Sequence, residues 1–211
     1  MTPLARMLRW LGVVPSAPVA EPRRPDTDAL TGLANRTTLH EALLATLQAG
    51  GHGVVVLLDV DNFKYFNERH GHRGGDELLI AIALRLHEAF PLAACVARTG
   101  GDQFAALLPA LALDGAMPLA QRCIEAMRQP VAVAGGTEIV TVSAGVATLD
   151  GQAERAVAAV WRACDAALHA AKMRGRDRVV AFDGDTRRIA ASRRDLMTTV
   201  AELQELSLIH I

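Results

Sequence analysis

Residues 54–61, Val-Val-Val-Leu-Leu-Asp-Val-Asp, decide the fold class of this 211-residue chain. Five consecutive apolar residues after Gly51-His52-Gly53 are typical of a strand that is buried on both faces. Asp59 and Asp61 come immediately after this predicted strand, where ligands collect in sheets of this kind. A strand covered on both sides needs helices packed on its sheet, so we expect an architecture of layers.

Helical and strand patterns alternate on either side of this run, without internal repeats. Further strands are predicted at 95–97, 104–108 and 179–182, a second hairpin at 131–133 and 139–146, and helices at 35–48, 74–90, 119–128 and 153–173. The first helix has a polar cap near Asn35. The predicted fold class is α+β, with a mixed β-sheet flanked by helices and a central β-hairpin that turns at Gly100-Gly101.

Composition narrows the range of partners. The chain is 51% hydrophobic and 21% charged, with a formal net charge of -1, so it gives no sign of a general nucleic-acid or membrane-surface binder. Its three cysteines, Cys95, Cys123 and Cys164, have no CxxC spacing, which argues against a disulfide framework or a zinc site. We interpret them as buried thiols in a reducing compartment and expect a cytoplasmic protein.

The positions of the acidic residues suggest a metal site. If the predicted hairpin lies beside the first strand, Asp59 and Asp102 converge. Two carboxylates and a backbone carbonyl are hard oxygen ligands suited to Mg²⁺. Gly100 and Gly101 would permit a turn with positive φ and let a bulky anion approach the backbone. Taken singly, the acids after the strand read equally well as caps, and Asp102 as a turn residue.

Polar side chains beyond the first strand are suited to a nucleotide. Lys64 is placed to meet a phosphate, and Asn67 and Asp76 can pair with the polar edge of a base. Such a pair discriminates strongly, because the wrong base leaves buried polar groups unpaired. His70 and His72 form an HxH that lacks acidic or cysteine partners at zinc-site spacing. No GxxxxGK[ST] run is present, which argues against a P-loop NTPase.

Five blocks, in order, resemble the GGDEF family of diguanylate cyclase domains. They are DALTGLANR at 28–36, DVDNFK at 59–64 with Asn67, Gly71-His72 and Gly75-Asp76, RTGGDQF at 98–104, TVSAGV at 141–146, and DAALHAAK at 165–172 with Gly175-Arg176. The resemblance runs from Asp28 to about Phe182. Five blocks in the correct order are a far more specific signal than any one of them.

The resemblance implies a nucleotidyl-cyclase-like fold that converts two GTP into cyclic di-GMP and pyrophosphate. It implies that Asp59, the Val60 carbonyl and Asp102 hold Mg²⁺ or Mn²⁺. The residues implied to contact substrate or to serve catalysis are Phe63, Lys64, Asn67, His72, Asp76, Gly100, Gly101, Asp102, Gln103, Lys172 and Arg176. Asn67 and Asp76 would read guanine. Each domain would hold one GTP, so the resemblance also implies a homodimer of facing domains.

Two of these cations have another reading. Lys172 and Arg176 are four residues apart on a predicted helix, and taken alone they would suit a solvated face. The resemblance instead implies that they neutralise phosphates, together with Lys64.

The chain departs from the family pattern in two places. The signature turn usually has an acid at its fourth position, where Gln103 stands. If that acid holds a second cation or handles the 3′-hydroxyl proton, its loss removes a factor on the order of 10² to 10⁴. The product-inhibition motif RxxD would fall on 91–94, which reads Pro-Leu-Ala-Ala. We therefore keep two functions open: an active cyclase, or a GTP-binding regulatory module of a truncated GGDEF-EAL protein.

The two ends of the chain are predicted to lie outside the folded domain. We predict an N-terminal helix and linker remnant at 1–26, a GGDEF-type domain at 27–183, a helical linker at 184–205 and a non-native tail at 206–211. The apolar residues of the first part are too few and too interrupted for a membrane span. The basic, then amphipathic, linker resembles those that precede an EAL phosphodiesterase domain. The last six residues match the translation of a transposon-derived sequencing adapter, with a genuine apolar tail as the alternative.

Overall fold

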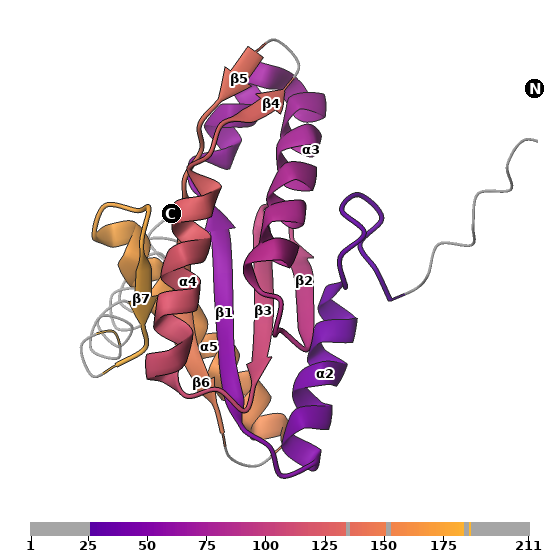
Figure 1. The fold of residues 1–211 in the computed structure, drawn as a ribbon, viewed down its shortest axis with the longest axis vertical. Coiled ribbons are helices and arrows are strands. Elements are labelled where there is room, and N and C mark those ends of the chain that lie inside the picture. The colour runs from indigo at the N-terminus through magenta and orange to yellow at the C-terminus, as the bar shows by residue number, and fades with distance from the viewer. Residues whose placement is uncertain (1–25, 134–135, 151–152, 184–185, 187–211) are drawn as a thin grey trace, which may run out of the picture.

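The computed structural model describes residues 26–133, 136–150, 153–183 and 186. Its strands are β1 (Gly53–Val60), β2 (Cys95–Gly100), β3 (Gln103–Pro109), β4 (Val131–Val133), β5 (Gly136–Glu138), β6 (Val142–Leu149) and β7 (Val179–Ala181). The helices are α2 (Arg36–Gln48), α3 (Phe63–Ala89), α4 (Leu113–Met127) and α5 (Ala153–Met173) (Figure 1). The segments predicted at the two ends, 1–26, 184–205 and 206–211, lie almost entirely outside the described residues.

Strand β1 lies at the centre of a five-stranded mixed sheet in the order β2-β3-β1-β6-β7. It pairs antiparallel with β3 and β6, whereas β6 and β7 are parallel. Every residue of β1 is buried, which confirms the predicted strand and the α+β fold class. The strand is longer than predicted, however, and Asp59 is its last but one residue rather than the first residue after it.

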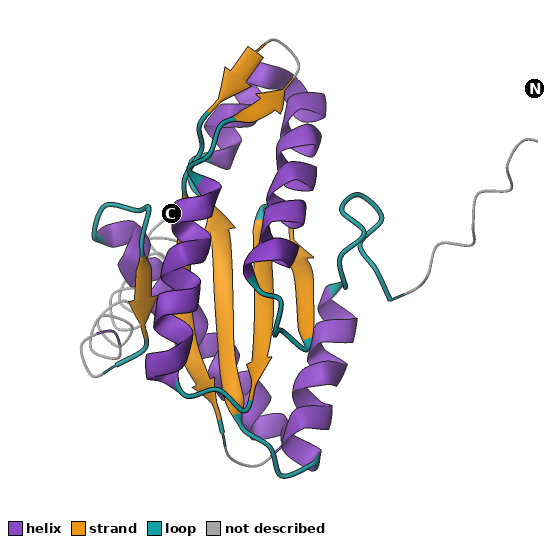
Figure 2. Ribbon diagram, viewed as in Figure 1, coloured by secondary structure: helices purple, strands orange, loops and turns teal. Residues whose placement is uncertain are grey.

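Alternate residues of β1 enter two separate cores. Val54, Val56 and Leu58 pack with α3 and α4, while Val55 and Leu57 pack with α2 and α5. Helices therefore cover both faces of the sheet (Figure 2). This alternation follows from the two-residue period of a strand, and it explains why the run is apolar without interruption.

Helix α5 approaches β6 very closely at Gly145. A Cβ atom at this position would lie 2.2 Å from the Cys164 carbonyl oxygen and 2.4 Å from the Leu168 nitrogen. Only glycine permits this contact between backbones. The close packing matters for the site because α5 carries Lys172 to the end of the central strand.

Several predicted boundaries were wrong. The helix predicted at 74–90 is the second half of α3, which a kink at Gly71 (φ 70) separates from a first half that begins at Phe63 and was not predicted. Helix α4 begins at Leu113 rather than at 119 and contains Pro118. Strand β4 pairs with β5, so residues 139–146 are not its hairpin partner. Strand β6 is instead nearly all buried beside β1.

The cysteines are only partly as predicted. Cys123 and Cys164 are buried, but Cys95 is half-buried. Burial raises the pKa of Cys123 to about 12 and also raises the pKa of Cys164, so both thiols stay protonated. None of the helices in the described part of the chain has the length and apolar character needed to span a bilayer.

Candidate metal and nucleotide site

The β2–β3 hairpin lies beside the end of β1, as predicted. Asp59 is paired with Gln103 in the β1–β3 register, and the Val60 N–H donates to the Asp102 carbonyl at 3.2 Å. Burial is the largest cause that raises the pKa of Asp59, and the negative charge of Asp102 adds to it. Asp59 and Asp102 are therefore close enough to interact, and their oxygens are a donor set that suits Mg²⁺.

Both carboxylate oxygens of Asp59 already have protein partners. Lys172 Nζ forms an ion pair with Oδ1, and Gln103 Nε2 donates to Oδ2 at 3.3 Å. The side chain of Asp59 is only 8% exposed. The resemblance placed Lys172 against phosphates, and nothing in the sequence indicated that it reaches this aspartate.

Asp61 has a structural role that separates it from Asp59. Its carboxylate accepts hydrogen bonds from Thr141 Oγ1 at 2.8 Å, Ser143 Oγ at 2.7 Å and the Asp177 backbone N–H at 3.1 Å. These bonds join the end of β1 to β6 and to the turn after α5. They also satisfy a buried carboxylate, so Asp61 stabilises the frame of the site.

The glycines of the signature turn do not have the predicted conformation. Gly100 and Gly101 are absent from the positive-φ residues of the described chain, so the turn does not require glycine for its backbone. A Cβ at either position would meet nothing within 4 Å. The turn therefore presents open backbone, which remains compatible with the close approach of an anion.

Arg98 holds this turn in place, a role that was not predicted from the sequence. Its Nη2 and Nε atoms donate to the Gly101 carbonyl at 2.6 and 3.0 Å, and Nη1 lies 3.1 Å from Asp28 Oδ1. Asp28 also accepts from the Thr31 N–H and hydroxyl. The available signal was that Asp28 opens the first sequence block and Arg98 opens the third.

The predicted base-reading residues occupy the first half of α3 and the start of its second half. Asn67 Oδ1 is buried without a hydrogen-bond partner in the part of the chain that the structure describes. Gly75 faces it so closely that a Cβ there would lie 1.9 Å from this oxygen and 3.2 Å from Phe63 Cζ. Asp76 is exposed. A buried amide oxygen without a partner is unusual and is what a group that awaits a ligand would look like.

The remaining predicted residues lie at the surface. Lys64 is 92% exposed and lies 4.0 Å from Glu68, and His72 is exposed. Arg176 does not share a helical face with Lys172, because α5 ends at Met173 and Arg176 lies in the following turn at φ 63. In the described part of the chain, none of these three residues forms a hydrogen bond or ion pair with Asp59.

His70, part of the HxH in the sequence, contacts Phe66 and Glu138. Its ring lies against Phe66, with centroids 4.6 Å apart, and Nε2 lies 3.1 Å from Glu138 Oε1. Among the described residues, no cluster of three or more histidine, cysteine, aspartate or glutamate side chains is arranged to hold a metal. A cation at Asp59 and Asp102 would therefore need oxygens from the backbone and the ligand as well.

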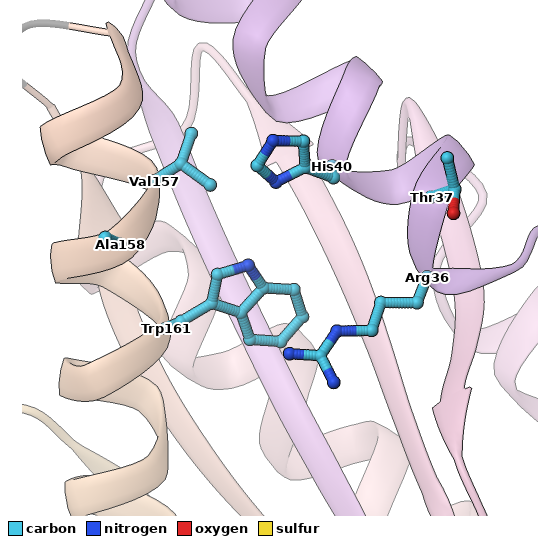
Figure 3. A pocket seen from close by; sticks show the side chains of 6 residues that line it. All are labelled: Arg36, Thr37, His40, Val157, Ala158 and Trp161. Atoms are coloured by element: carbon cyan, nitrogen blue, oxygen red, sulfur yellow. The ribbon is translucent and has the colours of Figure 1, made fainter.

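A separate hollow of about 420 Å³ lies between α2 and α5. It is lined by Arg36, Thr37, His40, Val157, Ala158 and Trp161 (Figure 3). The Arg36 guanidinium lies 5.9 Å from the centroid of the Trp161 ring, a cation–π contact between the two helices. None of the predicted site residues lines this hollow, so its walls do not belong to the Asp59 site.

The fold and these residues define an α+β domain with paired carboxylates at the end of its central strand. The sequence model of one family, described as diguanylate cyclase, GGDEF domain, matches residues 26–178. The chain belongs to the GGDEF family.

Similar proteins carry different activities in their names. The chain is 38% identical over 158 residues to the diguanylate cyclase DgcP of Pseudomonas aeruginosa. The matched region covers 72% of the chain and 23% of DgcP. It is 34% identical over 181 residues to the cyclic di-GMP phosphodiesterase NbdA of the same species, covering 84% and 22%. The chain thus spans less than a quarter of the length of either relative.

Solved structures agree with the fold. A GGDEF-only form of YfiN from Pseudomonas aeruginosa superposes with a TM-score of 0.68 at 32% identity, covering 77% of the chain and 98% of that structure. The GGDEF domain of DgcB from Caulobacter crescentus, in complex with c-di-GMP, superposes with the same TM-score at 29% identity, covering 76% and 97%.

Proposed function

We propose that this domain condenses two molecules of GTP into cyclic di-GMP and pyrophosphate as a metal-dependent homodimer. The observation that carries the proposal is the approach of Asp59 to Asp102 at the end of β1, with a buried, partnerless Asn67 oxygen on the helix that follows. The first feature suits a cation and its phosphates, and the second suits the edge of a base. Membership of the GGDEF family supports the same reaction.

Asp59, Asp102 and the Val60 carbonyl would hold Mg²⁺ or Mn²⁺. Such an ion lowers the pKa of a bound 3′-hydroxyl and stabilises the charge that develops on the α-phosphate. The near-complete burial of Asp59 keeps its carboxylate fixed in one place. The open backbone at Gly100 and Gly101 leaves room for phosphate oxygens beside the carboxylates.

Asn67 and Asp76 would select guanine. An amide oxygen accepts a hydrogen bond and a carboxylate accepts two, which matches the donors on the base edge of guanine. Phe63, packed beside Gly75, would bound this pocket. Lys64, His72, Lys172 and Arg176 would contact the rest of the nucleotide, with the cations opposite the phosphates.

Each domain would hold one GTP, so the 3′-hydroxyl of one nucleotide must come from a second domain. The reaction therefore needs two copies of the chain that face each other. Sedimentation at protein concentrations that bracket the onset of activity would test this requirement, since turnover should rise with the dimer fraction.

A second function is favoured by Gln103. Its side chain is neutral and donates to Asp59, so the turn holds one carboxylate where the family pattern has two acids. A domain of this kind would bind GTP and regulate an adjoining EAL phosphodiesterase with little turnover. The similarity to NbdA, a phosphodiesterase by name, supports this candidate.

The decisive experiment compares the parent chain with Gln103→Glu. Purified protein is incubated with GTP and Mg²⁺, and cyclic di-GMP is quantified by chromatography, with Asp102→Ala as the inactive control. Product from the parent that is lost in Asp102→Ala supports the cyclase. Tight GTP binding without product, together with a gain on the order of 10² or more in Gln103→Glu, supports the regulatory module. Equal affinity for ATP and GTP would contradict both.

A further inference from the structure

The ion pair between Lys172 and Asp59 links the last turn of α5 to the end of β1, across 113 residues of sequence. The Asp59 side chain is 8% exposed and that of Lys172 is 33% exposed. A carboxylate so deeply buried needs a counter-charge. Lys172 supplies it, while the Gln103 amide bonds the other oxygen at 3.3 Å.

Asp59 is also the residue that would hold a divalent cation. Magnesium ligand oxygens lie about 2.0–2.1 Å from the ion, so a cation on Oδ1 would sit beside the lysine ammonium. Two positive groups at that separation repel strongly in a partly buried site. Whichever oxygen of Asp59 takes the cation, an ammonium on the same carboxylate opposes its binding, so the cation binds best once Lys172 has left.

Lys172 has another anion within reach once it leaves Asp59. Its ammonium stands on a flexible four-carbon stem with three rotatable donors, and the side chain is partly open to solvent. The triphosphate of a nucleotide would lie beside the same metal. Lys172 can therefore exchange one oxyanion for another without becoming unpaired.

We propose that Lys172 is an exchangeable counter-cation that neutralises Asp59 until a metal–nucleotide complex binds and then pairs with its phosphates. The inference rests on the proposed function, because it requires that complex as the ligand. Free divalent cation binds weakly to such a site, since Lys172 is displaced without compensation. The metal–nucleotide complex binds well, since its phosphates take over the lysine.

Removal of Lys172 should therefore have opposite effects on the two ligands. Binding of free Mn²⁺ and of Mn²⁺–GTPαS is measured by electron paramagnetic resonance for the parent and for Lys172→Met. We expect free Mn²⁺ to bind on the order of tenfold more tightly in the variant, and Mn²⁺–GTPαS about tenfold more weakly. The matched control is Arg174→Met, which removes an exposed cation two residues away and should change neither affinity.

The outcomes separate this inference from the function on which it rests. Parent protein that binds Mn²⁺–GTPαS, with free Mn²⁺ bound no more tightly by Lys172→Met, overturns the exchange and leaves the proposed function standing. Parent protein that binds no Mn²⁺–GTPαS overturns both. Lys172→Arg keeps the charge and should preserve weak binding of free Mn²⁺. If circular dichroism shows that Lys172→Met is unfolded, the affinity of Lys172→Arg for free Mn²⁺ tests the exchange instead.

Discussion

Arg98 pairs with Asp28 across 70 residues of sequence, with Nη1 3.1 Å from Oδ1, and the same guanidinium holds the Gly101 carbonyl. One side chain thus ties the chain entry before α2 to the turn between β2 and β3. A planar guanidinium suits this task, because its donors are arranged as a rigid fork that lysine cannot reproduce. The turn beside Asp59 is held by a residue that makes no hydrogen bond or ion pair with Asp59 or Asp102 in the described part of the chain.

Arg98→Lys is expected to lower the free energy of unfolding by about 1–2 kcal/mol, because the bonds to the Gly101 carbonyl are lost. Asp28→Asn should cost less. Urea denaturation of both single variants and the double variant measures the coupling, which we expect at about 1 kcal/mol. Arg122→Lys, on an exposed position of α4, is the matched control. Strictly additive effects would show that the pair contributes nothing to stability.

Acid should weaken this pair. Burial tends to raise the pKa of Asp28, but hydrogen bonds from Thr31 and the contact with Arg98 together outweigh it, so the pKa lies below the ordinary 3.8. A depressed pKa gives stability that is present above the unfolded value and is lost as pH falls through the folded value. The difference in free energy of unfolding between the parent and Asp28→Asn should therefore become smaller below pH 3.8. Urea denaturation of both proteins at a series of pH values measures this difference. A gap that is constant with pH would contradict this assignment.

Asp59 should behave in the opposite way. Burial first, and then the charge of Asp102, raise the pKa of Asp59 above 3.8 despite the bonds from Lys172 and Gln103. The stability associated with its protonated form is present below the unfolded pKa and is lost as pH rises through the folded pKa. Asp59→Asn is thus expected to raise the urea midpoint at pH 7, with a gain that disappears below pH 3.8, while Mn²⁺ binding is lost. Asp165→Asn, exposed on α5, should change neither property. A lower midpoint at pH 7 would mean that the ion pair with Lys172 stabilises the fold.

Gly75→Ala tests the base pocket. The added methyl group would lie 1.9 Å from Asn67 Oδ1, the far end of a flexible side chain, so Asn67 should rotate away at little cost to stability. Alanine also favours the helix by about 1 kcal/mol over glycine. We expect a folded protein in which the preference for GTP over ATP, measured by competition binding, falls by about tenfold or more. If the variant keeps its preference for GTP over ATP, Asn67 does not contact the base.

Gly101→Ala tests the open turn. Its backbone has no positive φ and no atom within 4 Å of the added group, so the melting temperature should stay within about 2 °C, as for other surface changes. A methyl group on this backbone would still obstruct an approaching phosphate. Calorimetric titration with Mg²⁺–GTP should therefore show weaker binding. Gly32→Ala, at φ 73, is the contrasting control, since it should lower stability by about 1 kcal/mol.

The apolar run at 54–58 predicted the buried central strand, and the glycine turn predicted the hairpin next to it. Both were correct because strand burial and tight turns depend on local sequence. The predicted starts of two helices were wrong, because glycine and proline inside a helix look like helix ends in the sequence. Gly71 joins two halves of α3 that look separate in sequence, and Pro118 lies inside α4 although proline usually marks an end.

The sequence by itself determined that Asp59 lies at the end of a buried strand and Asp102 in a hairpin turn, since their neighbours specify a strand and a turn. The pairing of β1 with β3 then brought the two acids together at one end of the sheet. Only the tertiary structure decided which partners these acids have. Lys172 reaches Asp59 because Gly145 lets α5 pack closely on β6. The protein partners of Asp61 likewise come from β6 and from the turn after α5. These contacts join residues that lie 82 to 116 positions apart in the sequence, and no local pattern encodes which of them meet.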